Sequence, residues 1–359
     1  MWSVGVNGNF SLFGDTQRVL FPVREQSETT KRFLIHALEE GTCAGVSLLA
    51  ADDVGTLHMV RNALHHVCAK IPHFHPKRFR VALHTSPQWA DAEFHESVSA
   101  VLSHLQIDQL DLLLLARGTM PTAATTTERK AVVLRYWEQM ATAQRLGLVR
   151  QLGFADATIQ DMEFVFTACP DALPNAIDVC IDVASDAKPA HATEKLSTLL
   201  SFAHGNQMDV LVRLPYRTFE ENPDRSLRER WAHVVQGIAQ RVRDKTFELA
   251  VVHEAETDAY RMETRATKNT RALQSSTQVL VRYLVQKGVV VVPLPISSDS
   301  NQFDERDVET LFVDLTHPFT ALAPTHSPHV HYSSILTKEE LATIDHVLPL
   351  VVDFASFNL

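Results

Sequence analysis

The chain has 359 residues, 45% of them hydrophobic, which is enough for one large α/β domain or two smaller ones. Its formal net charge of −10 argues against the basic surfaces with which proteins bind nucleic acid or anionic lipid, so we expect neither a nucleic-acid nor a membrane partner. The four cysteines form no paired motif, and we expect reduced thiols.

The sequence shows no signal for export or for a bilayer. Its longest apolar runs, residues 110–116 and 289–293, have the length of strands and fall far short of the roughly 20 residues of a membrane-spanning helix. The amino end carries neither a secretory leader nor the arginine-rich pattern of a transit peptide. We therefore expect a soluble intracellular protein, cytoplasmic or attached to a cytoplasmic structure, with a mitochondrial location left open.

The chain begins with Asn7-Gly8 between two short alternating segments, which predicts a tight hairpin within a lead-in of residues 1–25. Helical and strand patterns then alternate along the chain. Strands are expected at residues 44–49, 78–85, 112–115, 149–154, 175–183, 209–216 and 289–293. Helices are expected at residues 28–41, 55–68, 94–105, 136–147, 159–166, 192–204 and 276–288, and after a capping box at 337–340.

About eight strand–helix units, with no glycine-rich dinucleotide motif after the first strand, predict an α/β protein folded as a (β/α)8 TIM barrel. No change of composition marks a boundary, so we expect a single domain over residues 1–359. Residues 219–272 and 316–332 interrupt the alternation and are expected to be surface loop insertions. The apolar tail at residues 349–359 should fold back on the barrel or meet a partner.

Three stretches carry recognisable motifs in a consistent order. Residues 105–119, LQIDQLDLLLLARGT, combine a helix end, Asp-Leu and an apolar strand. Residues 135–165 contain a Trp-Glu helix, Gly-Leu-Val-Arg, a strand that ends in glycine, and a further helix. Residues 276–297 give a helix and a strand, and ERDVETL follows them. Together these motifs resemble the aldo-keto reductase family over roughly residues 30–312 and 333–348, and the resemblance implies that family's barrel.

The resemblance implies NADPH-dependent carbonyl reduction. In that chemistry a tyrosine is the general acid, a lysine and an aspartate lower the pKa of its phenol, and a histidine orients the carbonyl oxygen. The tyrosine and aspartate are expected in the strand at 44–49, taken as the first of the barrel, and the loop after it, yet the first tyrosine of the chain is Tyr136. His84 stands where the lysine is expected, and Ala116 stands where the histidine is expected.

The cofactor positions implied by the resemblance are changed as well. Ala155-Asp156 replaces a Ser-Asn pair that holds the nicotinamide amide, Ile177-Asp178 replaces an Asn-Gln pair, and Leu294 replaces a phosphate-binding lysine. Carboxylates and an apolar side chain disfavour a polyanionic dinucleotide. The remaining candidates for cofactor contact are Arg306, Glu309 and Tyr216. We therefore expect no cofactor and leave weak NADP(H) binding open.

These losses lead to the first hypothesis, a catalytically inactive aldo-keto-reductase-like protein that serves as a structural or regulatory subunit among protein partners. The family contains such cases in the modifier subunit of glutamate-cysteine ligase and the β subunits of potassium channels. A second hypothesis is a divergent oxidoreductase with relocated acid–base groups, and a third is an NADP(H)-binding sensor. The residues that could carry relocated chemistry are His84, Asp52, Asp53, Asp156 and Asp178.

Simpler roles compete for several of these side chains. Adjacent carboxylates such as Asp52 and Asp53 after a strand are typical of a helix start. A lone histidine at a strand end, such as His84, is usually structural. Histidines gather at residues 65–75 and 326–331, but neither group has the spacing of a structural zinc motif, so we expect no metal.

Overall fold

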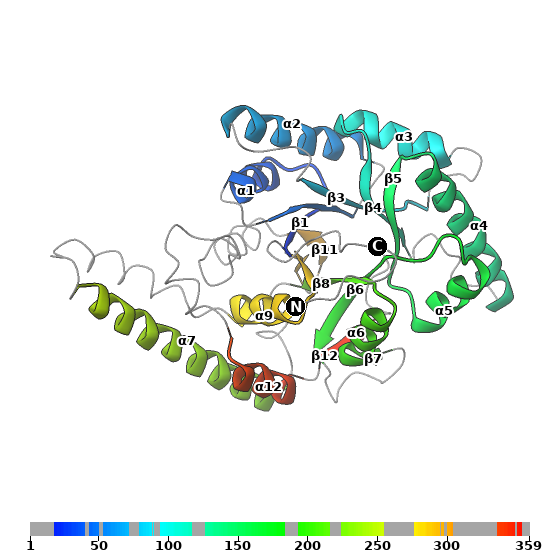
Figure 1. The fold of residues 1–359 in the computed structure, drawn as a ribbon. Helices are drawn as coiled ribbons and strands as arrows, with labels where there is room; N and C mark the ends of the chain where they lie inside the picture. The colour runs from blue at the N-terminus through cyan, green and yellow to red at the C-terminus, as the bar shows by residue number, and fades with distance from the viewer. Residues whose placement is uncertain are drawn as a thin grey trace.

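Parallel strands form the centre of the molecule, and helices surround them (Figure 1). The structure is a computed structural model. It describes residues 18–39, 43–49, 53–71, 79–87, 89, 94–116, 126–183, 193–215, 224–254, 276–294, 296–297, 300–303, 336–348 and 350–353. The predicted hairpin at Asn7-Gly8 and the predicted insertion at 316–332 lie outside these residues.

The described elements follow one another as strand and helix along most of the chain. The strands are β1 (Leu20–Val23), β2 (Gly45–Leu48), β3 (Arg80–His84), β4 (Leu110–Ala116), β5 (Val149–Ala155), β6 (Ala176–Val183), β7 (Thr193–Lys195), β8 (Asp209–Pro215), β9 (Val290–Leu294), β10 (Ile296–Ser297), β11 (Ser300–Phe303) and β12 (Leu350–Asp353). The helices are α1 (Glu28–Glu39), α2 (Val54–Lys70), α3 (Phe94–Leu105), α4 (Thr126–Arg145), α5 (Ile159–Ala168), α6 (Leu196–Gly205), α7 (Arg225–Glu254), α9 (Ser276–Gln286) and α12 (Lys338–Val347).

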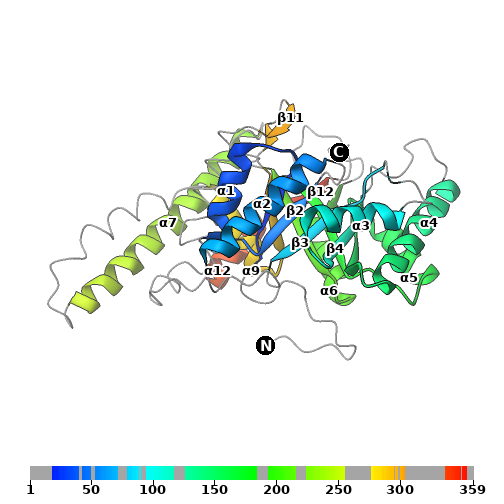
Figure 2. The same ribbon diagram turned by 90° about the horizontal axis from the view of Figure 1, so that it is seen from above.

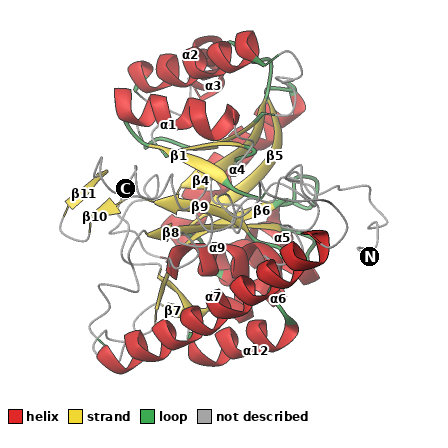
Figure 3. Ribbon diagram, turned by 90° about the vertical axis from the view of Figure 1, so that its left-hand side faces the viewer, coloured by secondary structure: helices red, strands yellow, loops and turns green. Residues whose placement is uncertain are grey.

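Eight of these strands form a nearly closed parallel barrel in the order β1, β2, β3, β4, β5, β6, β8, β9. The ring closes between its first and last strands, where Val19 forms a parallel bridge with Val291 and the Val291 amide donates to the Arg18 carbonyl at 2.7 Å. Figure 3 shows helices on both sides of the strands. The predicted (β/α)8 TIM barrel is confirmed.

Side-chain alternation separates two cores. Strand residues that face outward pack on the helices; in β4 these include Leu113 and Leu115, and both are fully buried. The residues of the second core face the barrel interior or its ends: Leu20, Ala44, Leu49, Ala82, Leu112, Leu114, Ala155, Ala176, Leu211, Val290, Val292 and Leu294. A strand buried on both faces reads as a continuous apolar run, which is why residues 112–115 are all leucine.

A buried carboxylate joins three strands at the amino-terminal end of the barrel. Asp111, the second residue of β4, accepts hydrogen bonds from Arg80 Nη1 at 2.9 Å and from the Val81 amide at 3.0 Å. Arg150 of β5 lies 3.4 Å from the same carboxylate. The Asp-Leu motif therefore aligns β3, β4 and β5 at their amino-terminal ends, opposite the carboxyl-terminal ends of the strands.

The structure corrects the strand count. The segment 20–23, predicted as part of the lead-in, forms β1, so the strand at 45–48 is the second of the barrel rather than the first, and each later strand moves by one place. This strand is only four residues long and contains Pro22. Proline and short length both weaken the strand pattern, which explains why the sequence did not predict it.

The segment 219–272 is also different from the expectation of a loop, because residues 225–254 form the 30-residue helix α7. Arg241 of α7 pairs with Glu340 of α12, with Nη2 2.9 Å from Oε2. Figures 1 and 2 show α7 extending beyond the rest of the barrel. The first half of the helix therefore packs on the core through Leu227, Trp231 and Ile238, and only its later part projects from the barrel.

The carboxyl-terminal part of the chain returns to the barrel. The capping box predicted at 337–340 is present: Thr337 accepts from the Glu340 amide, and the Glu340 side chain accepts from the Thr337 amide. After α12, strand β12 pairs antiparallel with the end of β6 and with β7. Residues 350–353 of the apolar tail thus fold back on the barrel. Within the described residues, none of the helices has the length and apolar character needed to span a bilayer.

Candidate functional site

Polar side chains gather inside the carboxyl-terminal half of the barrel, the end at which TIM-barrel enzymes place their active sites. His84 ends β3, Asp156 directly follows β5, Asp178 lies in β6 and Arg213 lies in β8. All four are buried, with exposed fractions of 3% for His84, 6% for Asp156 and 0% for the other two. We call these residues the barrel-mouth cluster.

The members of the cluster are in direct contact. Arg213 Nε donates to Asp178 Oδ1 at 2.9 Å, and Arg213 Nη2 donates to Asp156 Oδ1. His84 Nε2 lies 2.8 Å from Asp178 Oδ2, although the imidazole is not aligned for a straight hydrogen bond. The guanidinium therefore sits between two carboxylates, and one of those carboxylates also contacts the imidazole.

Strand alternation explains how Arg213 enters the interior. Val212 and Leu214 pack in the outer core, so Arg213 between them points inward, as Leu211 does two residues earlier. A charged side chain without exposure needs a counter-charge, since burying an isolated ion is very costly. Arg213 was not among the residues predicted for the site. The sequence does contain a signal for it, because an arginine within the apolar strand DVLVRLP would be buried and would therefore need an acidic partner on a neighbouring strand.

The charges in the cluster set the direction of two pKa shifts. Burial alone would raise the pKa of Asp178, but the Arg213 guanidinium and His84 outweigh it and hold that pKa below its ordinary value. Burial likewise favours loss of the Arg213 proton, yet Asp178 and Asp156 together raise its pKa above the ordinary arginine value. Both Asp178 and Arg213 therefore stay ionised.

Local backbone geometry turns Asp156 into the cluster. Its φ of 56° lies in the left-handed region, which aspartate tolerates better than most residues, and its amide donates to the Asp178 carbonyl at 2.9 Å.

At the end of the neighbouring strand β4, the Ala116 amide donates to Thr85 Oγ1 at 3.0 Å. Ala116 thus offers only a methyl group where the resemblance implies a carbonyl-orienting histidine.

Within the described part of the chain, the buried polar atoms of the barrel strands that have no hydrogen-bond partner include His84 Nδ1, Ser47 Oγ and Gln151 Oε1. Ser47 lies in β2 and is fully buried. The imidazole thus contacts Asp178 through Nε2 and keeps Nδ1 for another hydrogen bond. The cluster has the parts of a histidine–carboxylate pair, with the carboxylate also paired to arginine.

Other predicted residues lie elsewhere. Asp53 caps α2 by accepting from the Gly55 and Thr56 amides at 3.0 and 3.2 Å, so it is a helix start, and its pKa is lowered chiefly by the Thr56 side chain. Tyr136 lies on α4, outside the barrel, with its ring near Phe94. The predicted residues outside the described part of the chain are Asp52, Tyr216, Arg306 and Glu309.

The described positions that the resemblance implies for NADP(H) carry side chains unlike those it implies. The two carboxylate oxygens of Asp178 are already in contact with His84 and Arg213. A carboxylate accepts hydrogen bonds but does not donate them, whereas the carboxamide of nicotinamide needs both a donor and an acceptor. Leu294, at the position implied for a phosphate-binding lysine, is an interior side chain with 1% exposure. Among the described residues no lysine is buried, and no three His, Cys, Asp or Glu side chains gather as a metal site.

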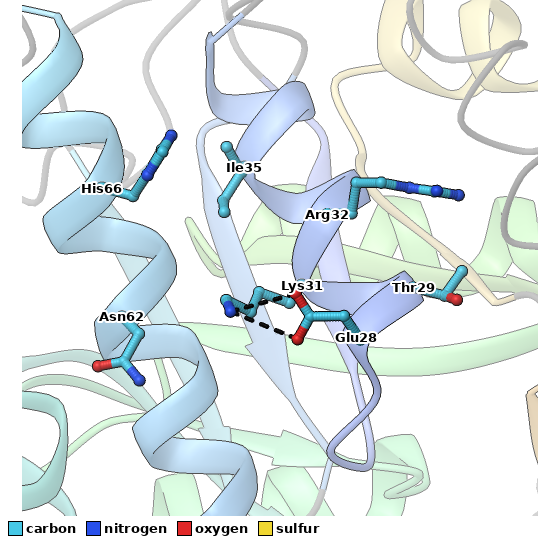
Figure 4. Close-up of a pocket in the computed structure, with 7 residues that line it drawn as sticks. All are labelled: Glu28, Thr29, Lys31, Arg32, Ile35, Asn62 and His66. Atoms are coloured by element: carbon cyan, nitrogen blue, oxygen red, sulfur yellow. Dashed lines mark hydrogen bonds and ion pairs between the residues drawn. The ribbon is translucent and has the colours of Figure 1, made fainter.

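A hollow of about 570 Å³ lies on the outer surface between α1 and α2, away from the barrel mouth (Figure 4). It is lined by Glu28, Thr29, Lys31, Arg32, Ile35, Asn62 and His66. Lys31 Nζ donates to the two carboxylate oxygens of Glu28 at 3.2 and 3.4 Å, and Glu28 is largely exposed. Exposed pairs of this kind contribute little, so we place no chemistry in this hollow.

The fold is similar to those of solved aldo-keto reductases. An aldo-keto reductase enzyme from a Medee basin deep-sea metagenome library aligns with a TM-score of 0.55 and 13% identity, over 96% of this chain and 94% of that one. The aldose reductase from Schistosoma japonicum aligns with a TM-score of 0.53 and 13% identity, over 91% and 87%. The Bombyx mori aldo-keto reductase in complex with NADP aligns with a TM-score of 0.52 and 15% identity, over 92% and 88%.

No protein-family model and no curated protein matches the sequence. At identities of 12–15% the structural likeness establishes the fold alone. The predicted resemblance is confirmed at that level: the chain is a barrel with the aldo-keto reductase fold.

Proposed function

We propose that this chain is a catalytically inactive barrel with the aldo-keto reductase fold and that it serves as a structural or regulatory subunit of a larger protein assembly. The observation that carries the proposal is the barrel-mouth cluster. Where carbonyl reduction would need a lysine and a histidine, the chain has His84, which contacts Asp178, and Ala116, which has no polar side chain. Two carboxylates paired with one arginine, beside an imidazole and a methyl group, do not reproduce the tyrosine, lysine and histidine that polarise a substrate carbonyl.

The absence of a suitable phenol in the described interior supports the same conclusion. Of the two described tyrosines, Tyr136 lies on α4 and Tyr283 lies on α9, both outside the barrel. Burial and the hydrogen bond to Asp345 raise the pKa of Tyr283, which is the opposite of the shift a general acid near neutral pH requires.

Elements beyond the barrel supply surfaces for a partner. The exposed face of α7 carries Arg225, Glu229 and Arg230, and the helix projects past the rest of the molecule (Figure 2). Buried Trp231 and Ile238 hold the other face of α7 to the barrel. A helix whose first turns present exposed charged side chains beside the barrel suits a polar protein interface.

A nucleotide titration tests the loss of function. Purified protein is titrated with NADPH and followed by the quenching of tryptophan fluorescence. We expect no saturable binding below the high-micromolar range, because the donor set does not suit the nicotinamide and Leu294 replaces a cation. Submicromolar binding contradicts the argument from the cluster.

Recovery of the native complex tests the subunit role. The tagged protein, isolated from cells in which it is native, should carry a partner in stoichiometric amount. Charge reversal on α7 with Arg225→Glu and Arg230→Glu should reduce that amount at least tenfold, whereas Glu138→Lys, an exposed change on α4, should not. A monomer without a stoichiometric partner, or equal recovery with all variants, contradicts the assignment.

One observation favours a second candidate, a divergent oxidoreductase. His84 combines an Nε2 contact to Asp178 with an unpartnered Nδ1 among the described atoms, the arrangement that a relocated general base would need. Carbonyl-dependent oxidation of NADPH that disappears in His84→Gln would favour this candidate over the inactive subunit.

A further inference from the structure

A pair of histidines joins two neighbouring helices on the outer ring of the barrel. His58 lies in the second turn of α2 and His104 lies in the last turn of α3, and the two helices pack side by side (Figure 2). His58 Nε2 is 3.2 Å from His104 Nδ1, and both side chains are half-buried. The pair lies outside the barrel-mouth cluster and plays no part in the function proposed above.

The geometry of the pair suits a chelated metal ion. The two nitrogens are 3.2 Å apart, the ring centroids are 5.1 Å apart, and the rings meet at 67°. A zinc ion about 2.05 Å from each nitrogen would place the nitrogens about 3.3 Å apart and the centroids about 5.2 Å apart at the tetrahedral angle. A straight hydrogen bond between the same nitrogens would place the centroids about 5.5 Å apart.

The electrostatic setting also suits a cation. The carboxyl-terminal end of a helix carries partial negative charge, and His104 lies in the last turn of α3. His58 is the fifth residue of α2, beyond the first turn in which the opposite end of the dipole acts. Arg61, one turn further along α2, donates to Asn62 Oδ1 rather than to either imidazole.

We propose that His58 and His104 form a two-imidazole site for a divalent transition-metal ion, zinc above all, that ties α2 to α3. Neutral imidazole is a preferred ligand of zinc, copper and nickel, whereas magnesium and calcium prefer oxygen. Water completes the coordination, so the expected dissociation constant, about 10⁻⁵ M, is far weaker than that of a four-ligand structural site.

Isothermal titration of the whole protein with zinc chloride tests the site. The other histidines of the chain make single variants necessary, namely His58→Gln, His104→Gln and the control His65→Gln, an exposed histidine on α2. We expect each of the first two variants to lose one equivalent of zinc at this affinity, and the control to retain it. Magnesium chloride should give no heat of binding in any of them. Isotherms of His58→Gln and His104→Gln that superimpose on that of the wild type overturn the proposal and leave the pair as a hydrogen bond.

Hydrogen exchange on the unmodified protein provides a second test that does not depend on the folding of a variant. Zinc should slow amide exchange in the last turn of α3 and in the second turn of α2 at least threefold, because an ion held by both helices opposes their local opening. Exchange in α5, which is remote in sequence from both ligands, should not change. Unchanged exchange in both ligand-bearing turns overturns the proposal.

Discussion

Replacing Arg213 with methionine should destabilise the protein strongly. The guanidinium is fully buried and is bonded to both Asp178 and Asp156, so its loss leaves two carboxylates without their cation in the barrel interior. Breaking a buried ion pair by removing one partner costs about 3–5 kcal/mol. For a chain of this length, unfolding entropy near the midpoint converts that cost to a fall in Tm of about 4–7 °C.

The matched control separates uncompensated charge from lost packing. Methionine retains much of the apolar volume of arginine, and the variant Arg213→Met with Asp156→Asn and Asp178→Asn removes the two orphaned charges as well. We expect this triple variant to regain more than half of the lost Tm, since a neutral replacement for a buried ionic network is often close to neutral in stability. Thermal unfolding followed by circular dichroism measures all three proteins. A single variant within about 1 °C of the wild type, or a triple variant no more stable than the single one, refutes the account of the cluster.

Three further outcomes follow from the same structure. The pKa of Asp178 is depressed, so its ionised form stabilises the fold fully above the ordinary aspartate pKa of about 3.9, and this contribution is lost as the pH falls through the lower pKa of the folded state. The Tm difference between the wild type and Asp178→Asn should therefore shrink below about pH 4. A Tm difference that stays constant with pH would contradict this. Burial raises the pKa of the Cys43 thiol to about 12, so a disulfide reagent at pH about 8 should label Cys43 at least about 100-fold more slowly in the native protein than in urea. Mass spectrometry measures the two labelling rates, and equal rates would show that the thiol is accessible in the native protein. In Gly153→Ala the new Cβ would lie 2.5 Å from the Ala176 carbonyl oxygen, so β5 and β6 must separate, which should lower the free energy of unfolding by about 2–3 kcal/mol. The control Gly237→Ala on α7 has open space around its new Cβ and should be neutral or stabilising. Urea unfolding measures both variants, and equal free energies of unfolding would argue against the close approach of β5 and β6.

The sequence predicted the parts of the fold that local patterns determine. The leucine run of β4 and the capping box of α12 each contain their structural signal within a few adjacent residues, and Gly288 ends the turn after α9 with a φ of 84°. Strand β1 was missed because four residues that include a proline carry almost no strand signal.

The barrel-mouth cluster depends on pairing between distant strands. Arg213 is 35 residues from Asp178 and 57 from Asp156, so their contact arises only when β5, β6 and β8 come together. The sequence therefore identified the acidic members through their positions after recognisable motifs, but it did not identify the arginine between them. The helix α7 was missed for a different reason. The segment 219–272 is strongly charged, and the apolar residues that repeat at helical spacing lie on only one side of the helix, so they are hard to recognise among the charges.

The most direct test of the central claim is carbonyl-dependent oxidation of NADPH by the purified protein, followed by absorbance across a panel of aldehydes and ketones, with an active aldo-keto reductase as the positive control. Loss of the tyrosine, lysine and histidine positions predicts a rate indistinguishable from that of buffer alone. Turnover that is present in the wild type and abolished by both His84→Gln and Asp178→Asn would show that the cluster is an active site, and would contradict the assignment of an inactive barrel.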